Sequence, residues 1–459
     1  MTNIAVIPID NRPICYDLIN DILSVDNNIN LFMPDISLLG GLSSTSNIDG
    51  IFEFIKNLKN IDYFVIALDT IAYGGLVTSR RCEDNYEIIK KRIEDFKEII
   101  PQDSKVFAFS SIMRISNNNI NEEEKEYWSL YGKKIFDWSY KSHKLGYETA
   151  ADVPFEILED YKNTRKRNFE INRLYLNLAH SGFFDTLIFS KDDCAEFGLN
   201  VQEARALKYL IQKDNINNVF IKTGADEIPL TLIARALSDK IKIKPVFIEK
   251  DSINNISKYE DVSIKNCAKA QLSLADAIIS ENPDLTLIIN NFKNEQGDLV
   301  LGDIINETDK VIDFPDTPYF IADVNNANGA DDNLIKQLLK CDTDNLYGYC
   351  GYNTSANTLG CTILEAIVKY RAQKNNSYND KAFKKLQLIR LLDDWSYQTK
   401  HRKYVRENPP FDIALDSIKD RLNSDCKKIC EFLNYYPNKI SYSLPWNRSF
   451  EIRIKVVES

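Results

Sequence analysis

Short apolar runs that alternate with amphipathic segments are the feature of this sequence that most limits its fold. Most of these runs carry consecutive Val, Ile, Phe or Leu without polar alternation, which is typical of strands buried on both faces. Helical segments separate them, so the strands are expected to be parallel in an α/β fold. The runs that we interpret as strands are 4–10, 30–35, 63–69, 105–113, 186–193, 218–227, 244–250, 285–291, 318–326 and 346–353.

Two regions depart from this alternation. Residues 122–180 are strongly helical and predict a helical insertion. After residue 375 the strand pattern stops, two helical segments follow, and 440–458 alternates like a β-hairpin. We therefore expect an α/β catalytic domain over 1–375, with insertions at 122–180 and 241–315, and a helical and hairpin region over 376–459.

Composition excludes some function classes. The net charge of −10 is spread along the 459 residues, which disfavours nucleic-acid and anionic-membrane binding. No apolar run reaches bilayer length, and the start of the chain lacks the pattern of a signal peptide. Nine cysteines without CxxC spacing favour reduced thiols, and we expect a cytoplasmic protein. A homo-oligomer is compatible with all of these features.

Polar clusters follow eight of the ten expected strands, always at the carboxyl end. In a closed (β/α)8 barrel every strand's carboxyl end faces one mouth, whereas an open sheet uses only the ends at its switch point. We therefore favour a barrel-like core, with the strands near 244 and 285 in an inserted lobe. The alternative is two Rossmann-like lobes around a cleft.

Some of these acidic residues have a structural interpretation as helix N-caps. Asp226 is placed to cap 228–237, and Asn357 to cap the helix from Thr358. Asp331 is placed to cap 332–340, which leaves Asp323 free for another role. Asp192 and Asp193 precede the next expected helix, at Asn200, by several residues.

Arginine, tyrosine and amide side chains complete the expected pocket. The arginines have an alternative role as salt-bridge partners of the acidic cluster. Gly74 and Gly75 allow a sharp bend that brings Tyr73 and Arg80 toward the strand ends. The expected substrate-binding residues are Asp10, Arg12, Asp69, Tyr73, Arg80, Arg114, Asn325, Asn328, Asn353 and Asn357.

Several longer motifs carry a resemblance to a known family. They include "PIDNRPICYD" (8–17), "LDTIAYGGLVTSR" (68–80), "GYNTSANTLG" (351–360) and "LPWNRSFE" (444–451). With these motifs the chain resembles an uncharacterised bacterial domain-of-unknown-function family that has a PxDxRPxxYD opening and a GxNTxxNTLG motif. Family members typically have Trp where this chain has Tyr352. The resemblance covers nearly the whole chain and implies a grouping without a mechanism.

Carboxylates, amides, Tyr and Arg suit recognition of vicinal hydroxyl groups, and paired carboxylates suit glycoside hydrolysis. We predict a glycoside hydrolase acting on a small glycan, with N-acetylhexosamine-containing glycans as one substrate class and no cofactor. Adjacent carboxylates resemble the pair of hexosaminidases that use the substrate's acetamide, with Asp193 as acid and Asp192 orienting that group. Further catalytic candidates are Asp226, Glu227 and Asp323.

Two other functions fit the same residues. The first is a hydrolase or phosphoryl-transfer enzyme that uses Mg²⁺ or Mn²⁺, because both ions prefer oxygen ligands. The second is a sugar-binding protein without catalysis. The three histidines share no local motif, so a histidine-built metal site is not expected.

Overall fold

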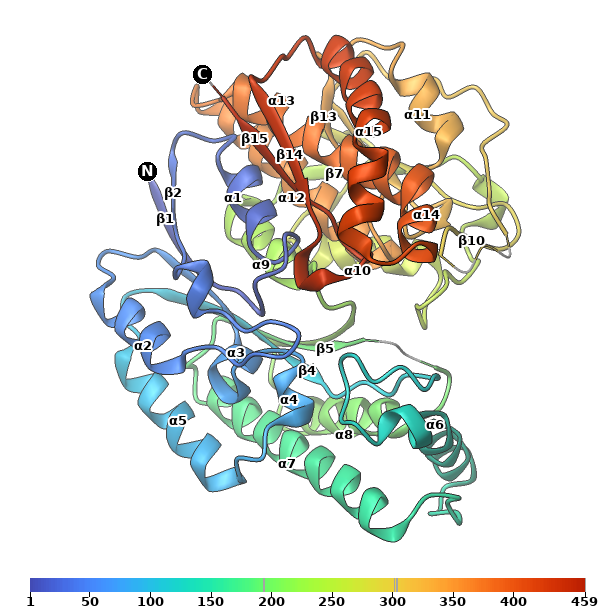
Figure 1. Ribbon diagram of the computed structural model, residues 1–459. Helices are drawn as coiled ribbons and strands as arrows, with labels where there is room; N and C mark the ends of the chain where they lie inside the picture. Colours follow the sequence, from blue (N-terminus) through green and yellow to red (C-terminus); the bar gives the residue numbers. More distant parts are fainter. Residues whose placement is uncertain (193–194, 301, 303, 459) are drawn as a thin grey trace. The chain divides into compact units, whose positions relative to one another are not determined.

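The computed structural model describes residues 1–192, 195–300, 302 and 304–458. These residues form two compact units, each built on its own sheet (Figure 1). The first unit contains residues 1–11, 30–229 and 259–261. The second contains residues 12–29, 230–258 and the described residues from 262 onward. The chain therefore passes between the units several times.

The first sheet has six strands. Their order is β2 (Ile29–Phe32), β1 (Thr2–Ile7), β3 (Tyr63–Ala67), β4 (Lys105–Ile112), β5 (Thr186–Lys191) and β6 (Val219–Thr223). The pairs from β1–β3 to β5–β6 are parallel. Most apolar side chains of β1, β3, β4 and β5 are buried, as the unbroken runs require. The helices of this unit are α2 (Ile48–Asn57), α3 (Leu68–Tyr73), α4 (Thr78–Arg81), α5 (Tyr86–Ile99), α6 (Trp128–Leu145), α7 (Phe155–His180) and α8 (Leu199–Lys213).

The second sheet has five strands. Their order is β8 (Ile278–Ile279), β7 (Lys242–Phe247), β9 (Leu285–Asn290), β11 (Tyr319–Asp323) and β13 (Leu346–Cys350), again with parallel pairs. Two short strands, β10 (Gly297–Asp298) and β12 (Asn326–Ala327), pair beside it. The accompanying helices are α1 (Asp17–Leu23), α9 (Ile228–Leu237), which begins where the chain leaves the first unit, α10 (Ile264–Leu274), α11 (Asp332–Leu338) and α12 (Ser355–Lys374).

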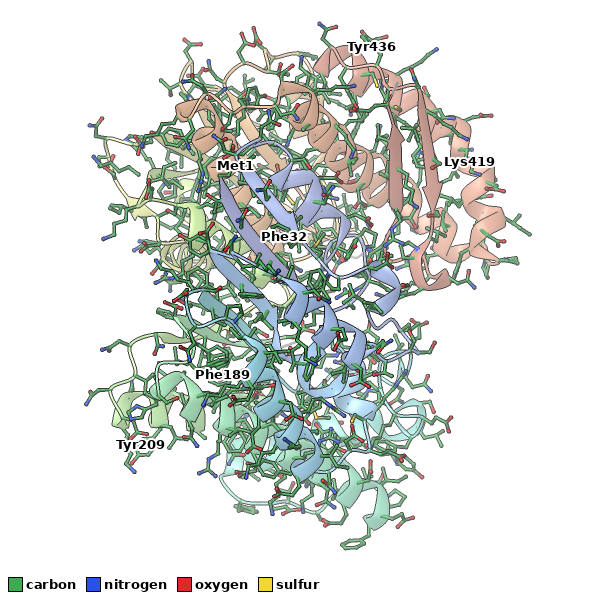
Figure 2. All side chains as sticks on the ribbon, turned by 90° about the vertical axis from the view of Figure 1, so that its left-hand side faces the viewer. Met1, Phe32, Phe189, Tyr209, Lys419 and Tyr436 are labelled. Atoms are coloured by element: carbon green, nitrogen blue, oxygen red, sulfur yellow. The ribbon has the colours of Figure 1, made fainter. Side chains whose placement is uncertain are left out.

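The C-terminal part of the second unit is helical and ends in a hairpin. It contains α13 (Asp380–Arg390), a π-helical segment η3 (Leu391–His401), α14 (Arg402–Glu407) and α15 (Phe411–Leu433). Strands β14 (Lys439–Ser443) and β15 (Arg453–Val457) pair antiparallel, which confirms the predicted hairpin. Lys419 and Tyr436 project from this region (Figure 2). In the first unit, Tyr209 projects from α8, and Phe189 is buried in the core at β5.

Both sheets have the same strand order over five strands. In each, the second strand of the chain pairs on one side of the first, and the later strands pair in succession on its other side. The direction of winding reverses between β1 and β3 in the first sheet and between β7 and β9 in the second. At such a reversal the connections leave in opposite directions, so a crevice opens outside the carboxyl ends of the two strands.

All ten strands expected from the sequence are present, so the parallel α/β prediction is confirmed. The barrel is not found, because the described strands form two separate open sheets, as in the two-lobe alternative. The strands near 244 and 285, which the barrel interpretation set aside, are β7 and β9, interior strands of the second sheet. In the described part of the chain, no helix combines the length and apolar character needed to cross a bilayer.

Candidate functional site

The residues expected to form one pocket belong to two groups. The first unit contains Asp10, Asp69, Tyr73, Arg80, Arg114, Asp192, Asp226 and Glu227, all after the carboxyl ends of its strands. The second unit contains Arg12, Asp323, Asn325, Asn328, Asn353 and Asn357. Asp193 lies outside the described residues. The predicted residues therefore follow strands of two different sheets.

The reversal point of the first sheet is held together by the turn after β3. The Thr70 hydroxyl donates to the carbonyl oxygens of Pro8 (2.7 Å) and Ile9 (3.2 Å), which follow β1. Gly74 and Gly75 have φ angles of +82° and +136°. A side chain at Gly74 would clash with the Thr45 hydroxyl, and one at Gly75 would press on the Ile9 carbonyl. The sharp bend expected at the two glycines is present, and it allows this close approach.

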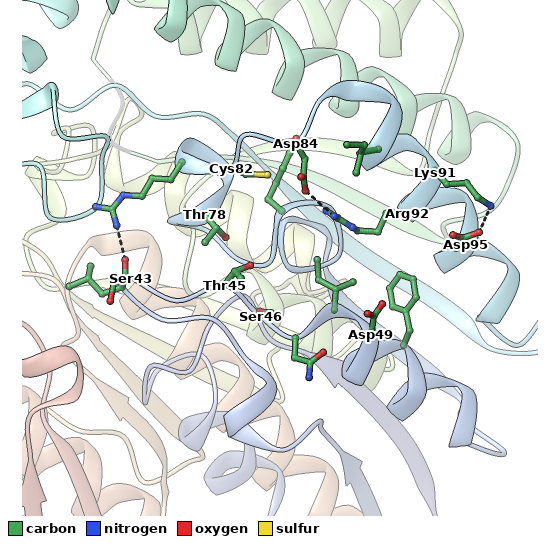
Figure 3. A pocket seen from close by; sticks show the side chains of 17 residues that line it. Ser43, Thr45, Ser46, Asp49, Thr78, Cys82, Asp84, Lys91, Arg92 and Asp95 are labelled. Carbon is green, nitrogen blue, oxygen red and sulfur yellow. Dashed lines mark hydrogen bonds and ion pairs between the residues drawn. The ribbon is translucent and has the colours of Figure 1, made fainter.

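A cavity of about 790 Å³ lies beside this turn, between the loop after β2, the segment after β3 and α5 (Figure 3). Its lining includes Tyr73, hydroxyl groups such as Thr45 and Thr78, and charged groups such as Arg81 and Asp49. The volume and mixed lining are those of a small-molecule site. A crevice at a strand-order reversal is also where open α/β sheets bind ligands.

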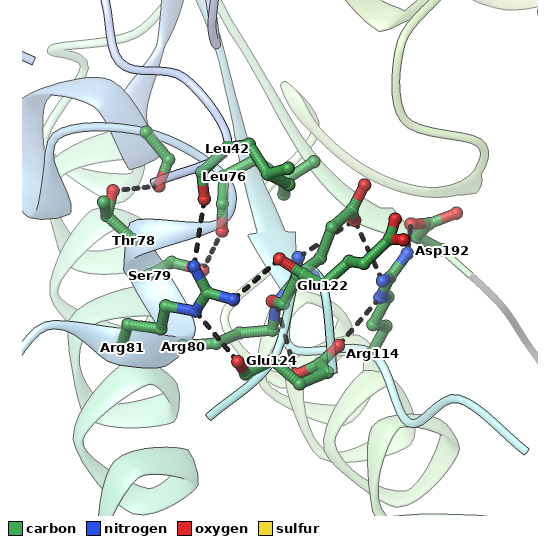
Figure 4. A network of polar contacts seen from close by, with 12 residues as sticks. Leu42, Leu76, Thr78, Ser79, Arg80, Arg81, Arg114, Glu122, Glu124 and Asp192 are labelled. Atoms are coloured by element: carbon green, nitrogen blue, oxygen red, sulfur yellow. Dashed lines mark hydrogen bonds and ion pairs between the residues drawn. The ribbon is translucent and has the colours of Figure 1, made fainter. Parts of the chain in front are cut away.

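Arg80 and Arg114 take part in a network of ion pairs (Figure 4). Arg80 lies 3.3 Å from a carboxylate oxygen of Glu123 and 3.4 Å from one of Glu124. Arg114 contacts the same two glutamates at 2.9 and 3.2 Å and reaches Asp192 at 3.5 Å. Both arginines therefore have the salt-bridge role that was the alternative to ligand binding. Glu123 and Glu124 were not anticipated, because they lie in the segment interpreted as helical.

The side chain of Arg81, next to Arg80, binds backbone carbonyl groups of the segment that contains Glu123 and Glu124. Its guanidinium donates to the carbonyl oxygens of Asn121 (3.0 Å), Glu122 (2.7 Å) and Glu124 (2.9 Å), and to that of Leu42 (3.0 Å). These bonds hold residues 121–124 outside any helix and direct Glu123 and Glu124 toward the arginines. The two arginines of α4 thus connect the cavity wall with the Asp192 region.

Asp69, in the first turn of α3, is buried. Its carboxylate accepts a hydrogen bond from the Ser111 backbone N–H at 2.9 Å. Burial raises the pKa of Asp69 to about 6, although that bond opposes the rise. The Arg167 guanidinium lies 5.4 Å from the centroid of the Tyr73 ring. Burial, together with the charge of Asp69, raises the pKa of the Tyr73 hydroxyl. At neutral pH Tyr73 is therefore a neutral hydroxyl in the cavity wall.

A second acidic group follows β5 and β6. Glu227 is fully buried and accepts a hydrogen bond from the Ala225 backbone N–H at 3.0 Å. Burial, reinforced by the charges of Glu260 and Asp226, raises the pKa of Glu227 to about 8. Gly224, at φ +121°, leaves room for this carboxyl, because a Cβ there would lie 1.8 Å from its Oε1.

Residues 259–261 join this group from a distant part of the sequence. The Asp261 carboxylate pairs with the Lys191 ammonium at the end of β5 and accepts from the Thr223 hydroxyl at the end of β6 (2.5 Å). These contacts place Glu260 next to Glu227. No local pattern in the sequence connects residue 260 with residue 227, so this neighbour could not be predicted.

In the second unit, Asp323 is fully buried at the end of β11. Its carboxylate accepts from the Asn290 amide (2.9 Å), the Asp331 backbone N–H (2.7 Å) and the Tyr349 hydroxyl (3.1 Å). Burial, together with the nearby Asp331 carboxylate, raises the pKa of Asp323 to about 8. This position differs from that of Asp192, which is partly exposed in the other unit.

The amide residues around Asp323 fix the loop from 324 to 331. Asp331 caps α11, as expected, by accepting from the Asn333 and Leu334 backbone N–H groups, and its other oxygen accepts from the Asn325 amide at 2.7 Å. Asn328, at φ +65°, donates its backbone N–H to the Asn353 carbonyl at 2.7 Å. These contacts are internal to the loop and its neighbours.

Arg12 and Asn357 complete the second group. The Arg12 guanidinium pairs with Glu451 at 3.4 Å and lies 5.4 Å from the Trp446 ring centroid, so the opening motif contacts the 444–451 motif. Asn357 does not cap a helix from Thr358, because α12 begins earlier, at Ser355, with Thr354 as its cap. Within the described residues, no three His, Cys, Asp or Glu side chains are arranged to hold a metal ion.

Comparison with known proteins places the chain in a family. No curated protein and no solved structure matches it. The model of one family, described as protein of unknown function DUF4127, matches residues 4–455. That match spans nearly the whole chain, in agreement with the resemblance carried by its motifs. The chain therefore belongs to the DUF4127 family.

Proposed function

We propose that the chain is a glycoside hydrolase whose catalytic carboxyl groups follow β5 and β6 of the first unit. The observation that supports this is the contrast between two carboxyl environments. Asp192 is partly exposed and forms an ion pair with Arg114 at 3.5 Å. Glu227 is buried beside Asp226 and Glu260, and its pKa of about 8 keeps it protonated at neutral pH. Glycoside hydrolysis requires one protonated and one ionised carboxyl group.

The two groups belong to one edge of the sheet. Lys191 and Thr223 are paired across β5 and β6, and the Gly224 N–H donates to the Lys191 carbonyl at 2.9 Å. The residues that directly follow these strands, Asp192 on one side and Asp226 with Glu227 on the other, therefore start from adjacent positions. Arg114 follows β4, the next strand in the same sheet.

In this proposal the Asp226–Glu227 pair is the acid. The charge of Asp226 adds to the effect of burial on the Glu227 carboxyl, and Asp226 is the more exposed member of the pair. The pair donates a proton to the glycosidic oxygen as the bond from that oxygen to the anomeric carbon breaks. Asp192 acts as base or nucleophile toward the same carbon, and water supplies the hydroxyl of the product.

The test is hydrolysis of a panel of p-nitrophenyl glycosides, including N-acetylhexosaminides, by the full chain. Asp192→Asn and Asp226→Asn are each expected to lower kcat at least a hundredfold, because each removes a proton-transfer or charge-stabilising group. Asp214→Asn, at the exposed end of α8, is the matched control and should retain full activity. Full activity in Asp192→Asn, or no hydrolysis of any glycoside by the unmodified chain, would refute the proposal.

A second candidate is a sugar-binding protein without catalysis. The cavity at the first reversal point favours it, because that cavity is lined by hydroxyl and charged groups and lies apart from the carboxyl groups after β6. Calorimetric titration with glycans separates the two functions. Binding that persists unchanged through long incubation, with intact glycan recovered, supports the binding protein.

A further inference from the structure

The second sheet has a cavity at its own reversal point. The cavity has a volume of about 380 Å³ and lies where β7 and β9 end, with Glu249 after β7 and Asn291 after β9 in its wall. Its other walls come from residues 293–295, from the segment 304–309 and from Asn325. This is the position, relative to the strand order, where open α/β sheets bind ligands. The volume lies within the range of small-molecule sites.

The inner wall consists of carboxamides that are already fixed. Asn291 donates its amide to the Glu249 carbonyl at 3.0 Å and accepts from the Glu249 backbone N–H at 3.0 Å. Asn306 donates its amide to the carbonyl oxygens of Glu295 (2.8 Å) and Asn325 (3.0 Å). The polar wall is therefore held in place before any ligand arrives, which lowers the entropic cost of binding. Apolar side chains contribute little to the lining, where Ile304 is the aliphatic member.

Carboxylates outnumber cations at this cavity. Its wall contains Glu249, Glu295, Glu307 and Asp309, against the single ammonium of Lys293. Glu249 is neutralised by Lys310 at 2.9 Å, and Glu295 lies 3.8 Å from Lys258. Glu307 and Asp309 are exposed, and no ion pair to either is found in the described part of the chain. The local field therefore favours a cationic ligand.

We infer that this cavity binds a small hydroxyl-bearing primary amine, namely an amino sugar in its protonated form. The ammonium group lies near Glu307 and Asp309, where its charge is balanced, and the hydroxyl groups contact the carboxamide wall and Asn294. The cavity and its place at the strand reversal identify the site, and the carboxylates determine the class of ligand. This site is independent of the hydrolase proposal, because it lies in the other unit.

Calorimetric titration of the full chain at pH 6.5 tests this inference with D-glucosamine, D-glucose and N-acetyl-D-glucosamine. Glucosamine should bind at least tenfold more tightly than either neutral sugar, because only it carries an ammonium group. The double variant Glu307→Gln/Asp309→Asn should weaken glucosamine binding at least tenfold. The matched control, Glu281→Gln/Asp316→Asn, removes two exposed carboxylates of the same unit outside the cavity and should bind as the unmodified chain does.

Absence of glucosamine binding, equal affinity for glucose, or unchanged affinity in the double variant would each overturn the inference. Hydrolysis of p-nitrophenyl glycosides, measured on the same double variant, should equal that of the unmodified chain. Loss of binding without loss of hydrolysis therefore tests this site alone, and failure of the hydrolase proposal leaves the binding result intact.

Discussion

The carboxylate of Asp323 accepts a hydrogen bond from the backbone N–H of Asp331 at 2.7 Å, so one acidic residue orients the helix cap formed by another. Burial, with Asp331 adding to it, raises the pKa of Asp323 to about 8, far above the usual value of an aspartate. At pH values between the usual pKa of an aspartate and about 8, the folded state binds a proton at Asp323 that the unfolded state has released. Stability contributed by this proton is therefore present at low pH and is lost as the pH rises toward 8.

The Asp323→Asn variant tests this linkage, because its side chain keeps a carbonyl oxygen and does not titrate. From pH 5 to pH 8 the free energy of unfolding of the unmodified chain should fall by about 3 kcal/mol relative to that of the variant. Urea unfolding at several pH values measures the difference. Asp313→Asn, an exposed position in the same unit, should follow the unmodified chain. Parallel pH profiles for Asp323→Asn and the unmodified chain would contradict this prediction.

Lys369 should give a pH dependence of the opposite sign. Its ammonium donates to the Leu346 carbonyl at 2.6 Å and lies 3.9 Å from the Phe383 ring centroid. Burial lowers its pKa to about 8, so above that pH the folded state has released a proton that the unfolded state still binds. Stability should therefore increase by about 2 kcal/mol from pH 8 to pH 10, relative to Lys369→Met. Lys374→Met, on the exposed face of the same helix, is the control, and an identical increase in Lys369→Met would refute the assignment.

Gly224 should tolerate no side chain. Gly224→Ala combines a left-handed backbone, at φ +121°, with a Cβ 1.8 Å from the Glu227 carboxyl oxygen. Gly146→Ala has a similar backbone cost at φ +77° but meets no atom within 4 Å, and it should destabilise the chain by about 1 kcal/mol. Gly224→Ala should cost about 2 kcal/mol more, because the Glu227 carboxyl must move. Equal melting temperatures for the two variants would show that the carboxyl is not held there.

Arg114 should stabilise the folded state, because it compensates the buried charge of Glu124. The Glu124 side chain is 5% exposed and shares Arg114 with Glu123, so Arg114→Ala leaves buried negative charge with less compensation. Removing one partner from such a network costs about 3 kcal/mol. The control is Arg173→Ala, whose partner Glu170 is 38% exposed and whose loss should cost less than about 0.5 kcal/mol. Chemical denaturation of both variants measures the two costs.

The strands of this protein could be predicted because their signal is local. A run such as Ile4–Ile7 or Leu285–Ile289 is apolar on both faces, and only a covered parallel strand satisfies that pattern. The assignment of strands to sheets could not be predicted in this way. Polar residues mark the carboxyl end of a strand, but they carry no information about which strand is its neighbour. One barrel and two open sheets therefore gave the same pattern, and the barrel was the wrong choice.

The candidate site was predictable only in part, for a related reason. Asp331 as a helix cap follows from its position one residue before α11, and this prediction is confirmed. The contacts of Glu260 with Glu227, and of Glu123 with Arg114, join residues through the fold and leave no periodic mark on the sequence. Residues 122–124 even favour a helix by composition, yet Arg81 binds the carbonyl groups of Glu122 and Glu124 and the segment forms a turn.

The passage of the chain between the two units determines the order in which they can be completed during synthesis. Helix α1 leaves the ribosome well before α13, but Asp21 pairs with Lys385 at 2.8 Å and Asp26 accepts from Ser377 at 2.5 Å. More than three hundred residues must be translated before these partners emerge. Until then the nascent polypeptide carries an apolar helical face, Leu18 and Ile22 included, that chaperones can recognise.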